Sequence, residues 1–324
     1  MSAPGATPIL EARNLTKHFP VKRGVLARTI GVVRAVDGVS FSVGAGRTLG
    51  LVGESGCGKT TTAKLVLRLE EPTGGALRFE GAEIAGLGGA DVKQYRRAVQ
   101  AVFQDPFASL NPRMRVDAII AEPLVTHERL AAAEVAKRVR QVIDLVGLPE
   151  RSARLFPHEF SGGQRQRIAI ARSLSLSPRL VVLDEPVSAL DVSIRAQILN
   201  LLRDLQAQLG LSYLFIAHDL AAVAHMSHTI AVMYLGQIVE IGEAATVATR
   251  PRHPYTQALF AAALPSHPSE PREEMVLTGE VPSPLNPPAA CRFHPRCPHA
   301  MPRCSSEEPA LHEHDGRRVA CHLY

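Results

Sequence analysis

The chain has 324 residues, of which 46% are hydrophobic and 21% charged, and its formal net charge is +5. These values predict a soluble globular protein with ample core. No apolar stretch approaches the roughly 18 residues of a membrane-spanning helix, and the first eight residues lack the basic start and apolar centre of a signal peptide. The composition therefore excludes a membrane span, and the dispersed Lys and Arg residues indicate a solvated surface.

The first informative segment is a glycine-rich loop, GESGCGKT, that fits the phosphate-binding pattern G-x-x-x-x-G-K-[ST] at every fixed position. The apolar run Thr48 to Val52 predicts a buried strand before it, and Lys59 to Leu69 predict a helix after it. Backbone N–H groups of such a loop close around phosphate oxygens. Lys59 is expected on the β- and γ-phosphates and the Thr60 hydroxyl on Mg²⁺. The predicted ATP-binding residues here are Gly53, Glu54, Ser55, Gly56, Cys57, Gly58, Lys59, Thr60 and Thr61.

A second segment, Leu180 to Pro186, predicts a buried strand that ends in two carboxylates, Asp184 and Glu185. In a doubly wound sheet, ligands bind outside the carboxyl ends of the strands. We expect Asp184 to hold Mg²⁺ and Glu185 to accept a proton from the water that attacks the γ-phosphate. The alternative is a capping acid at a turn.

A third segment, Ser161-Gly162-Gly163-Gln164, precedes a run of helix formers that ends near Leu174. Ser161 is the predicted helix cap. Two glycines clear side chains from the helix start, so an anion can approach the backbone. Taken alone, Ser-Gly-Gly would be an ordinary turn.

With these three segments, the chain resembles the nucleotide-binding subunits of ABC transporters over essentially its whole length. The resemblance implies an α/β P-loop NTPase fold: a RecA-like core, an antiparallel β subdomain and a helical insertion. It implies that Gln104, in Val102 to Pro106, reaches Mg²⁺ and the attacking water, and that His218 contacts the γ-phosphate. Phe19 is the candidate for the aromatic that stacks on adenine, with a plain core residue as the alternative.

The resemblance also implies that two ATPase subunits bind ATP between them, head to tail. The P-loop of one subunit and the signature helix of the other would contact each nucleotide. The residues expected to act on the partner's nucleotide are Ser161, Gly162, Gly163, Gln164, Ser188 and Asp191.

The expected organisation has a disordered start at residues 1–8, an ATP-binding domain at 9–245 with a helical subdomain at about 105–176, and an extension at 246–324. Ala131 to Leu148 predict a periodic helix, and Ile230 to Glu240 predict a hairpin turning at Gly236. Thirteen of the 24 prolines lie between Pro251 and Pro309, so little regular structure is expected there beyond a short helix, Tyr255 to Leu264.

Four of the five cysteines lie in the last 34 residues, with the spacing C-x5-C-x6-C-x16-C. They are Cys291, Cys297, Cys304 and Cys321. Disulfides are disfavoured in a reducing cytosol, and the paired C-x-x-C elements of zinc ribbons are absent from the sequence. Four thiolates in a proline-rich segment suit an iron–sulfur cluster or a zinc ion, for which five nearby histidines offer substitute ligands, and free or oxidised thiols remain a third possibility.

The tail resembles the carboxyl-terminal extension of oligopeptide and dipeptide importer ATPases, through HPYTQAL, VPSPLNPP and CRFHPRCP, and FASLNPRM resembles their F-type subunit. Some relatives hold a [4Fe-4S] cluster on such cysteines. The implied partners are two transmembrane permease subunits, a second ATPase, for which a sister chain is favoured over a second copy and both stay open, and indirectly a periplasmic or lipoprotein substrate-binding protein. The implied location is the cytoplasmic face of the membrane.

Other solutes stay open as cargo, among them nickel chelates and glutathione. A chromosome or repair ATPase would insert a long coiled coil, but only 100 residues separate Thr60 from Ser161, and a tandem-cassette ribosomal factor would carry two P-loops. No nucleic-acid partner is therefore expected.

Overall fold

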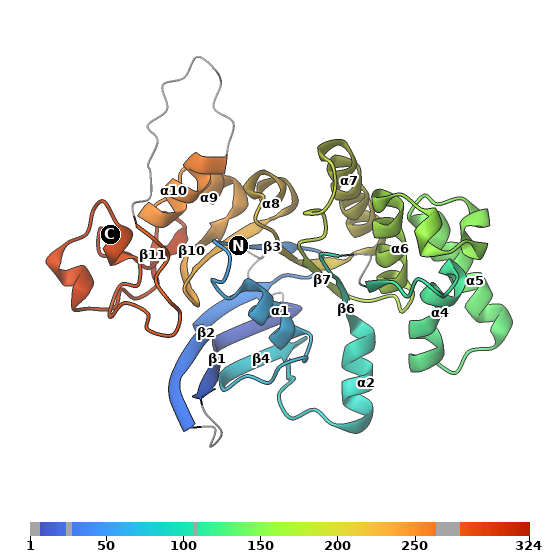
Figure 1. Ribbon diagram of the computed structural model, residues 1–324, viewed down its shortest axis with the longest axis horizontal. Helices are drawn as coiled ribbons and strands as arrows, with labels where there is room; N and C mark the ends of the chain where they lie inside the picture. The colour runs from blue at the N-terminus through green and yellow to red at the C-terminus, as the bar shows by residue number, and fades with distance from the viewer. Residues whose placement is uncertain (1–6, 24–27, 106–108, 264–278) are drawn as a thin grey trace, which may run out of the picture. The chain divides into compact units, whose positions relative to one another are not determined.

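The computed structural model describes residues 7–23, 28–105, 109–263 and 279–324. The chain divides into two compact units: unit 1 comprises residues 1–44, 48–85 and 216–324, and unit 2 comprises residues 45–47 and 86–215. Most of the expected disordered start, and Pro106 to Ala108 of the segments named above, lie outside the described residues. Figure 1 labels helices and strands of both units.

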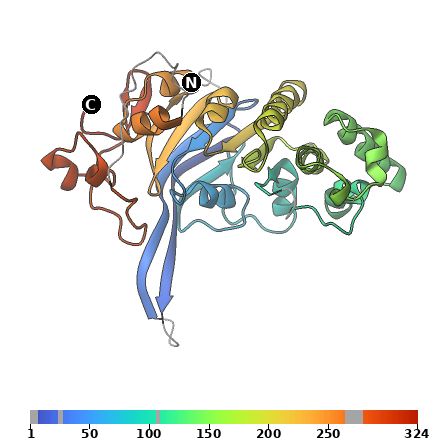
Figure 2. The ribbon, with the colours of Figure 1, turned by 45° about the horizontal axis from the view of Figure 1, so that its top comes forward.

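Unit 1 contains an antiparallel sheet in the order β2-β1-β4-β5. Its strands are β1 (Leu10–Arg23), β2 (Arg28–Val43), β4 (Gly74–Phe79) and β5 (Ala82–Glu83). β1 and β2 form a long two-stranded ribbon with several register shifts (Figure 2). Such shifts are typical of bulges, which bend and twist long strands.

A second run of strands in unit 1 has the order β11-β12-β10-β9-β3. The bounds are β3 (Thr48–Val52), β9 (Thr229–Tyr234), β10 (Gln237–Glu243), β11 (His312–His314) and β12 (Arg317–Val319). β3 pairs parallel with β9, and β9 and β10 form the predicted hairpin. Its turn residues Leu235 and Gly236 have φ values of 42° and 85°, as a two-residue hairpin turn of the primed type requires.

The helices of unit 1 are α1 (Lys59–Val66), α8 (Leu220–Met226), α9 (Ala244–Thr249) and α10 (Pro254–Ala263), with 3-10 turns at His294–Arg296 and Pro302–Ser305. The strand Thr48–Val52 and the helices after it and at the start of the tail confirm the sequence-based predictions. The hairpin of β11 and β12 was not predicted, although its two turn residues, Asp315 and Gly316, are the Asp-Gly pair typical of a two-residue hairpin and have φ values of 49° and 72°.

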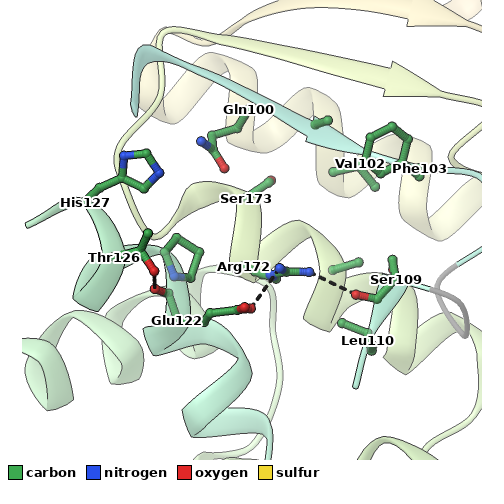
Figure 3. Close-up of a pocket in the computed structure, with 13 residues that line it drawn as sticks. Gln100, Val102, Phe103, Ser109, Leu110, Glu122, Thr126, His127, Arg172 and Ser173 are labelled. Atoms are coloured by element: carbon green, nitrogen blue, oxygen red, sulfur yellow. Dashed lines mark hydrogen bonds and ion pairs between the residues drawn. The ribbon is translucent and has the colours of Figure 1, made fainter. Parts of the chain in front are cut away.

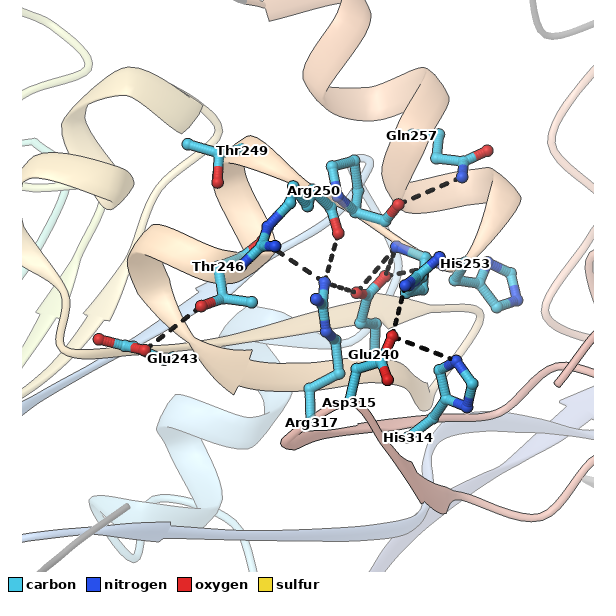
Figure 4. Close-up of polar contacts among 12 residues, drawn as sticks. Glu240, Glu243, Thr246, Thr249, Arg250, His253, Gln257, His314, Asp315 and Arg317 are labelled. Atoms are coloured by element: carbon cyan, nitrogen blue, oxygen red, sulfur yellow. Dashed lines mark hydrogen bonds and ion pairs between the residues drawn. The ribbon is translucent and has the colours of Figure 1, made fainter.

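A buried ion pair attaches this hairpin to the sheet (Figure 4). β12 pairs with β10, placing Val319 opposite Glu240. The Glu240 side chain is fully buried and accepts hydrogen bonds from the backbone N–H groups of Arg252 and His253. The Arg317 guanidinium lies 3.5 Å from Glu240 and donates to the carbonyl of Arg250. The end of the chain is therefore an integral part of unit 1.

Unit 2 has the strand order β8-β7-β6, with β6 (Val99–Val102) parallel to β7 (Leu180–Asp184), followed by β8 (Ser212–Ile216). Its helices are α2 (Gly89–Ala98), α4 (Val116–His127), α5 (Ala132–Leu145), α6 (Gly162–Leu174) and α7 (Val192–Leu209), with 3-10 turns at Glu150–Arg154 and Pro157–Glu159. α4, α5 and α6 pack against one another, and α5 confirms the predicted periodic helix. Every residue of β7 and β8 is buried, so these strands form the centre of the unit.

Candidate nucleotide-binding site

The glycine-rich loop lies between β3 and α1 in unit 1, in the predicted order of strand, loop and helix. Its backbone depends on glycine. Gly53 and Gly58 have φ values of 149° and 113°, and a Cβ on either would lie 2.2 Å from a carbonyl oxygen, that of Met233 or Ala35. α1 has no side-chain cap and no acidic residue in its first turn. The loop therefore presents backbone N–H groups and a positive helix end, both suited to phosphate.

Lys59 is almost completely buried within this loop. Its ammonium donates to the carbonyl oxygens of Gly53, at 2.7 Å, and Glu54, at 3.0 Å. Nζ also lies 3.7 Å from the Cys57 sulfur. Burial raises the pKa of the Cys57 thiol despite the nearby ammonium, which favours the protonated thiol over the thiolate. The only cation of the loop is thus held by the loop itself.

His218 and Phe19 also belong to unit 1. His218 follows β8 and is exposed, and the Asp219 side chain caps α8 by accepting from the Ala222 N–H at 3.1 Å. Phe19 lies in β1 opposite Val33, and the Lys17 ammonium lies 4.9 Å from its ring centroid. The half-buried ring stays a candidate for stacking on a base.

The paired carboxylates are in unit 2, at the end of β7. Asp184 is 8% exposed and Glu185 is half-buried. Glu185 has a left-handed backbone with φ of 51°, and its carbonyl accepts a hydrogen bond from the Ser188 hydroxyl at 3.1 Å. A non-glycine residue in this conformation costs on the order of 1 kcal/mol, and such strain concentrates at functional sites.

The Ser-Gly-Gly-Gln segment begins α6, and Ser161 is its cap, as predicted. The Ser161 hydroxyl accepts from the Gln164 N–H at 3.4 Å, and the Gln164 side chain accepts from the Ser161 N–H at 3.0 Å. These two hydrogen bonds form a reciprocal capping box. The first turn of α6 contains no acidic residue. The helix start therefore suits an anion.

The two glycines of that segment differ in their surroundings. A Cβ on Gly163 would lie 2.5 Å from Cγ2 of Ile194 in α7, whereas one on Gly162 would meet only Leu190 at 3.4 Å. Gly163 therefore lets α6 and α7 pack closely. The sequence alone did not reveal this reason for a glycine.

Three further predicted site residues lie in unit 2. Asp191 precedes α7, and Ser188 lies in the turn after β7. Gln104 follows β6 and is exposed.

A cavity of about 320 Å³ in unit 2 lies beside β6, with Gln100 and Phe103 in its lining (Figure 3). Phe103, Leu110, Pro123 and Ala169 give it apolar walls. Arg172 crosses it, donating to the Ser109 carbonyl at 2.9 Å and to the Glu122 carboxylate at 2.8 Å. The hollow thus combines an apolar wall with a fixed ion pair.

The four tail cysteines are all described, and all are unpaired thiols. Burial raises the pKa of Cys291, Cys297 and Cys321, and neighbouring thiols add to each rise. Within the described residues, however, no three Cys, His, Asp or Glu side chains are arranged to hold a metal ion. The thiols therefore lie near one another without forming a ligand set.

Two residues that the sequence did not identify as functional contact the glycine-rich loop. The Glu54 N–H donates to the Tyr255 hydroxyl at 2.8 Å, and Arg296 forms an ion pair with the Glu54 carboxylate. Both lie in tail segments that had only a family resemblance to mark them.

The fold and these loops define a P-loop ATPase of the ABC type. A family model described as ABC transporter matches residues 36–188, and one described as oligopeptide/dipeptide transporter, C-terminal region, matches residues 239–304. The chain belongs to the ATP-binding proteins of oligopeptide and dipeptide ABC transporters, as relatives across its whole length show.

Three of these relatives illustrate the similarity. A probable peptide ABC transporter ATP-binding protein of Sinorhizobium fredii is 51% identical over 97% of this chain and 90% of its own length. The oligopeptide transport ATP-binding protein AppF of Bacillus subtilis is 49% identical over all of both chains. The dipeptide transport ATP-binding protein DppF of Escherichia coli is 48% identical, covering 97% of this chain and 94% of its own.

Solved structures agree. CbiO1 from Clostridium perfringens, part of an ABC transporter complex, is 26% identical with a TM-score of 0.65, covering 75% of this chain and 92% of its own. A dimeric ATP-binding cassette bound to ADP and Pi is also 26% identical, with a TM-score of 0.63, covering 72% and 98%. The chain is therefore an ABC ATPase. No helix in its described part combines the length and apolar character needed to cross a bilayer.

Proposed function

We propose that this chain hydrolyses ATP to drive the uptake of dipeptides and oligopeptides through separate transmembrane subunits. The supporting observation is full-length similarity to ATP-binding proteins that are named for dipeptide or oligopeptide transport. The match of residues 239–304 to the C-terminal region of such transporters extends this similarity beyond the ATP-binding core. The chain would work at the cytoplasmic face of the membrane, as a peripheral subunit.

The residue roles follow from the chemistry of the side chains. Lys59 would leave the loop carbonyls for the β- and γ-phosphates, and Thr60 would hold Mg²⁺ together with Asp184 and Gln104. Glu185 would take the proton of the attacking water, with His218 on the γ-phosphate. Mg²⁺, when bound, would neutralise charge on the phosphate oxygens.

ATP would be bound between two ATPase subunits. Within the described residues, the starts of α1 and α6 suit phosphate, because each combines glycine at the helix start with a first turn that lacks acidic residues. A single nucleotide has one triphosphate, which α1 suffices to bind. The α6 start, with Ser188 and Asp191, would therefore serve the nucleotide of a second subunit, a sister ATPase or another copy. A dimeric cassette among the structural neighbours supports this arrangement.

The cavity lined by Phe103 and Arg172 would receive a helix of a transmembrane subunit. Phe103, 42% exposed at its rim, offers apolar area to such a helix. Because Phe103 precedes Gln104, movement of the docked helix would reach a residue proposed to contact Mg²⁺. Ser109, Glu122 and Arg172 of the cavity lining belong to the proposed helical subdomain at about 105–176.

We also propose that Cys291, Cys297, Cys304 and Cys321 bind a [4Fe-4S] cluster, with zinc as the alternative. The support is the four-cysteine spacing together with the closeness of two of the segments, because the Cys291 N–H donates to the Cys304 carbonyl at 3.1 Å. Side-chain rotations would have to complete the ligand set. Anaerobic purification followed by iron, sulfide and zinc analysis tests this proposal. A colourless protein with one equivalent of zinc, or none of these elements, would contradict the cluster.

The experiment on transport uses the chain reconstituted in liposomes with its two membrane subunits, sister ATPase and binding protein. We expect ATP-dependent uptake of a labelled dipeptide or oligopeptide, and no uptake with Glu185→Gln. Uptake of a nickel chelate or of glutathione instead, with no response to peptides, would reject the peptide assignment while keeping the ATPase role. ATPase activity stimulated by nucleic acid would reject both.

A further inference from the structure

Two residues of the carboxyl-terminal extension contact one residue of the phosphate-binding loop, Glu54. The Tyr255 hydroxyl accepts the Glu54 N–H at 2.8 Å. The Arg296 guanidinium makes two hydrogen bonds to the Glu54 carboxylate, at 2.8 Å and 3.0 Å. The backbone and the side chain of Glu54 are thus both fixed, by partners 201 and 242 residues away in the sequence.

Both partners are themselves rigidly placed. The Arg296 side chain is only 6% exposed, and its guanidinium also lies 3.4 Å from the Tyr234 hydroxyl. Tyr255 is fully buried, with its ring centroid 4.7 Å from that of Tyr234 and 5.5 Å from that of Phe293. Packed aromatic rings of this kind have few alternative rotamers. The contacts on Glu54 therefore come from a fixed surface.

A second arginine supports the loop at another point. Arg292, four residues before Arg296, forms a buried ion pair with Asp37 and donates to the Leu235 carbonyl. The next residue after Leu235, Gly236, donates its N–H to the Cys57 carbonyl at 2.8 Å. Burial alone would raise the pKa of Asp37, but hydrogen bonds from Arg292 and His18 hold it below its ordinary value. The Cys291–Cys297 segment thus contacts the loop directly through Arg296 and indirectly through Arg292.

None of these contacts occupies the groups that bind phosphate. The phosphate-binding donors are expected in the turn from Gly56 into α1, whereas the Glu54 N–H already donates to Tyr255. Glu54, which the sequence placed among the ATP-binding residues, therefore joins the loop to the extension through both its backbone and its side chain. A two-point Arg–carboxylate pair fixes direction as well as distance, which lysine cannot reproduce.

We propose that Arg296 and Tyr255 are positioning residues, which hold the phosphate-binding loop in the shape that receives ATP. The extension thereby sets the affinity of the ATPase for nucleotide. This inference rests on the proposed role of the loop in binding the triphosphate. A purely structural attachment of the extension would instead change stability and leave the KM for ATP as it was.

The test is a double-mutant cycle on the assembled transporter, with Arg296→Met, Glu54→Gln and the pair together. We expect each single variant to raise the KM for ATP by about tenfold, since hydrogen bonds between charged groups typically contribute that much. The kcat at saturating ATP should change less than twofold. The double variant should resemble either single one, because both remove the same interaction.

Further variants separate positioning from folding. Tyr255→Phe keeps the buried ring and removes only the acceptor of the Glu54 N–H, so it should raise KM by roughly threefold, the effect of one neutral hydrogen bond. Arg296→Lys should fall between wild type and Arg296→Met. Arg303→Ala is the matched control, because Arg303 is exposed in the same extension and pairs only with Glu307. Its KM should be that of wild type.

Lys59→Ala, measured beside these variants, separates the two proposals. Weakened binding in Lys59→Ala with an unchanged KM in Arg296→Met and Tyr255→Phe would overturn this inference alone. Additive effects of Glu54→Gln and Arg296→Met would also overturn it, since independent losses mean no shared contact. Unchanged affinity in Lys59→Ala would overturn the role of the loop and, with it, this inference.

Discussion

The ammonium of Lys59 lies 2.7 Å from the carbonyl oxygen of Gly53, the first residue of its own loop. The lysine therefore bridges the two ends of the glycine-rich loop and fills the space between them. A triphosphate that enters the loop has to take over this cation, so the same group serves first to shape the loop and then to bind the ligand.

Lys59→Ala should weaken ATP binding by at least roughly tenfold, because a charge-assisted contact with phosphate is lost together with the bridge across the loop. Calorimetric titration of Mg–ATP measures this directly. Lys64→Ala is the control, since Lys64 is exposed in the last turn of the same helix. Equal affinities for Lys59→Ala and wild type would show that the loop does not bind the triphosphate through this residue.

Gly163→Ala should lower the free energy of unfolding by about 1–3 kcal/mol, the usual cost of overpacking. The added Cβ would lie 2.5 Å from Ile194, so α6 and α7 would have to separate. Urea unfolding measures the change. Ile194→Ala should restore much of the loss in the double variant, and Gly162→Ala, with 3.4 Å of space, should be nearly neutral. No rescue by Ile194→Ala would mean that Gly163 is required for another reason.

His253 should make the protein less stable in acid. Burial lowers its pKa to about 3, from an ordinary value of 6.5, and its Nδ1 accepts the Tyr255 N–H at 3.1 Å. The unfolded chain therefore binds a proton at this position before the folded one does. The free energy of unfolding therefore decreases as the pH falls from 6.5 toward 3, by up to about 1.4 kcal/mol per pH unit.

His253→Asn isolates this contribution, because an asparagine side-chain oxygen accepts the same N–H and does not titrate. The variant should lose less stability between pH 7 and pH 5 than wild type, as measured by urea unfolding at each pH. Parallel stability curves for the two proteins would show that His253 does not carry the acid sensitivity.

Arg317→Met should destabilise the protein by about 3–5 kcal/mol, the typical cost of removing one member of a buried ion pair and leaving the other charge buried without it. Glu240 is fully buried and would keep only its backbone donors. Adding Glu240→Gln should recover part of the loss, because no buried charge then remains. Thermal unfolding compares the variants. Arg317→Met with wild-type stability would contradict the role of this pair in attaching the chain end.

The elements with local sequence patterns were predictable. The strand Thr48–Val52 is a continuous apolar run, and Ser161 with Gln164 forms the capping box that its sequence indicates. Contacts between distant segments were not predictable. The register shifts of β1 against β2, the pairing of β12 with β10 and the attachment of Arg296 to Glu54 depend on partners that no local pattern specifies.

In the candidate site, too, short local patterns were predictable and tertiary contacts were not. The residue types and spacings identified the loop, the two carboxylates and the signature segment, because each pattern is short and chemically specific. The left-handed backbone of Glu185 and the close packing of Gly163 on Ile194 were not foreseen, since both arise from the surrounding turn and helix and not from the residue itself.

We propose above that each ATP is held by the glycine-rich loop of one subunit and by the α6 start of another. A structure of the assembled transporter with Glu185→Gln and Mg–ATP tests it most directly, because this variant should bind ATP without hydrolysing it. We expect a closed ATPase pair in which Ser161 of this chain contacts the γ-phosphate bound to the other subunit. A nucleotide contacted by one ATPase alone, with Ser161 facing solvent, would contradict the claim.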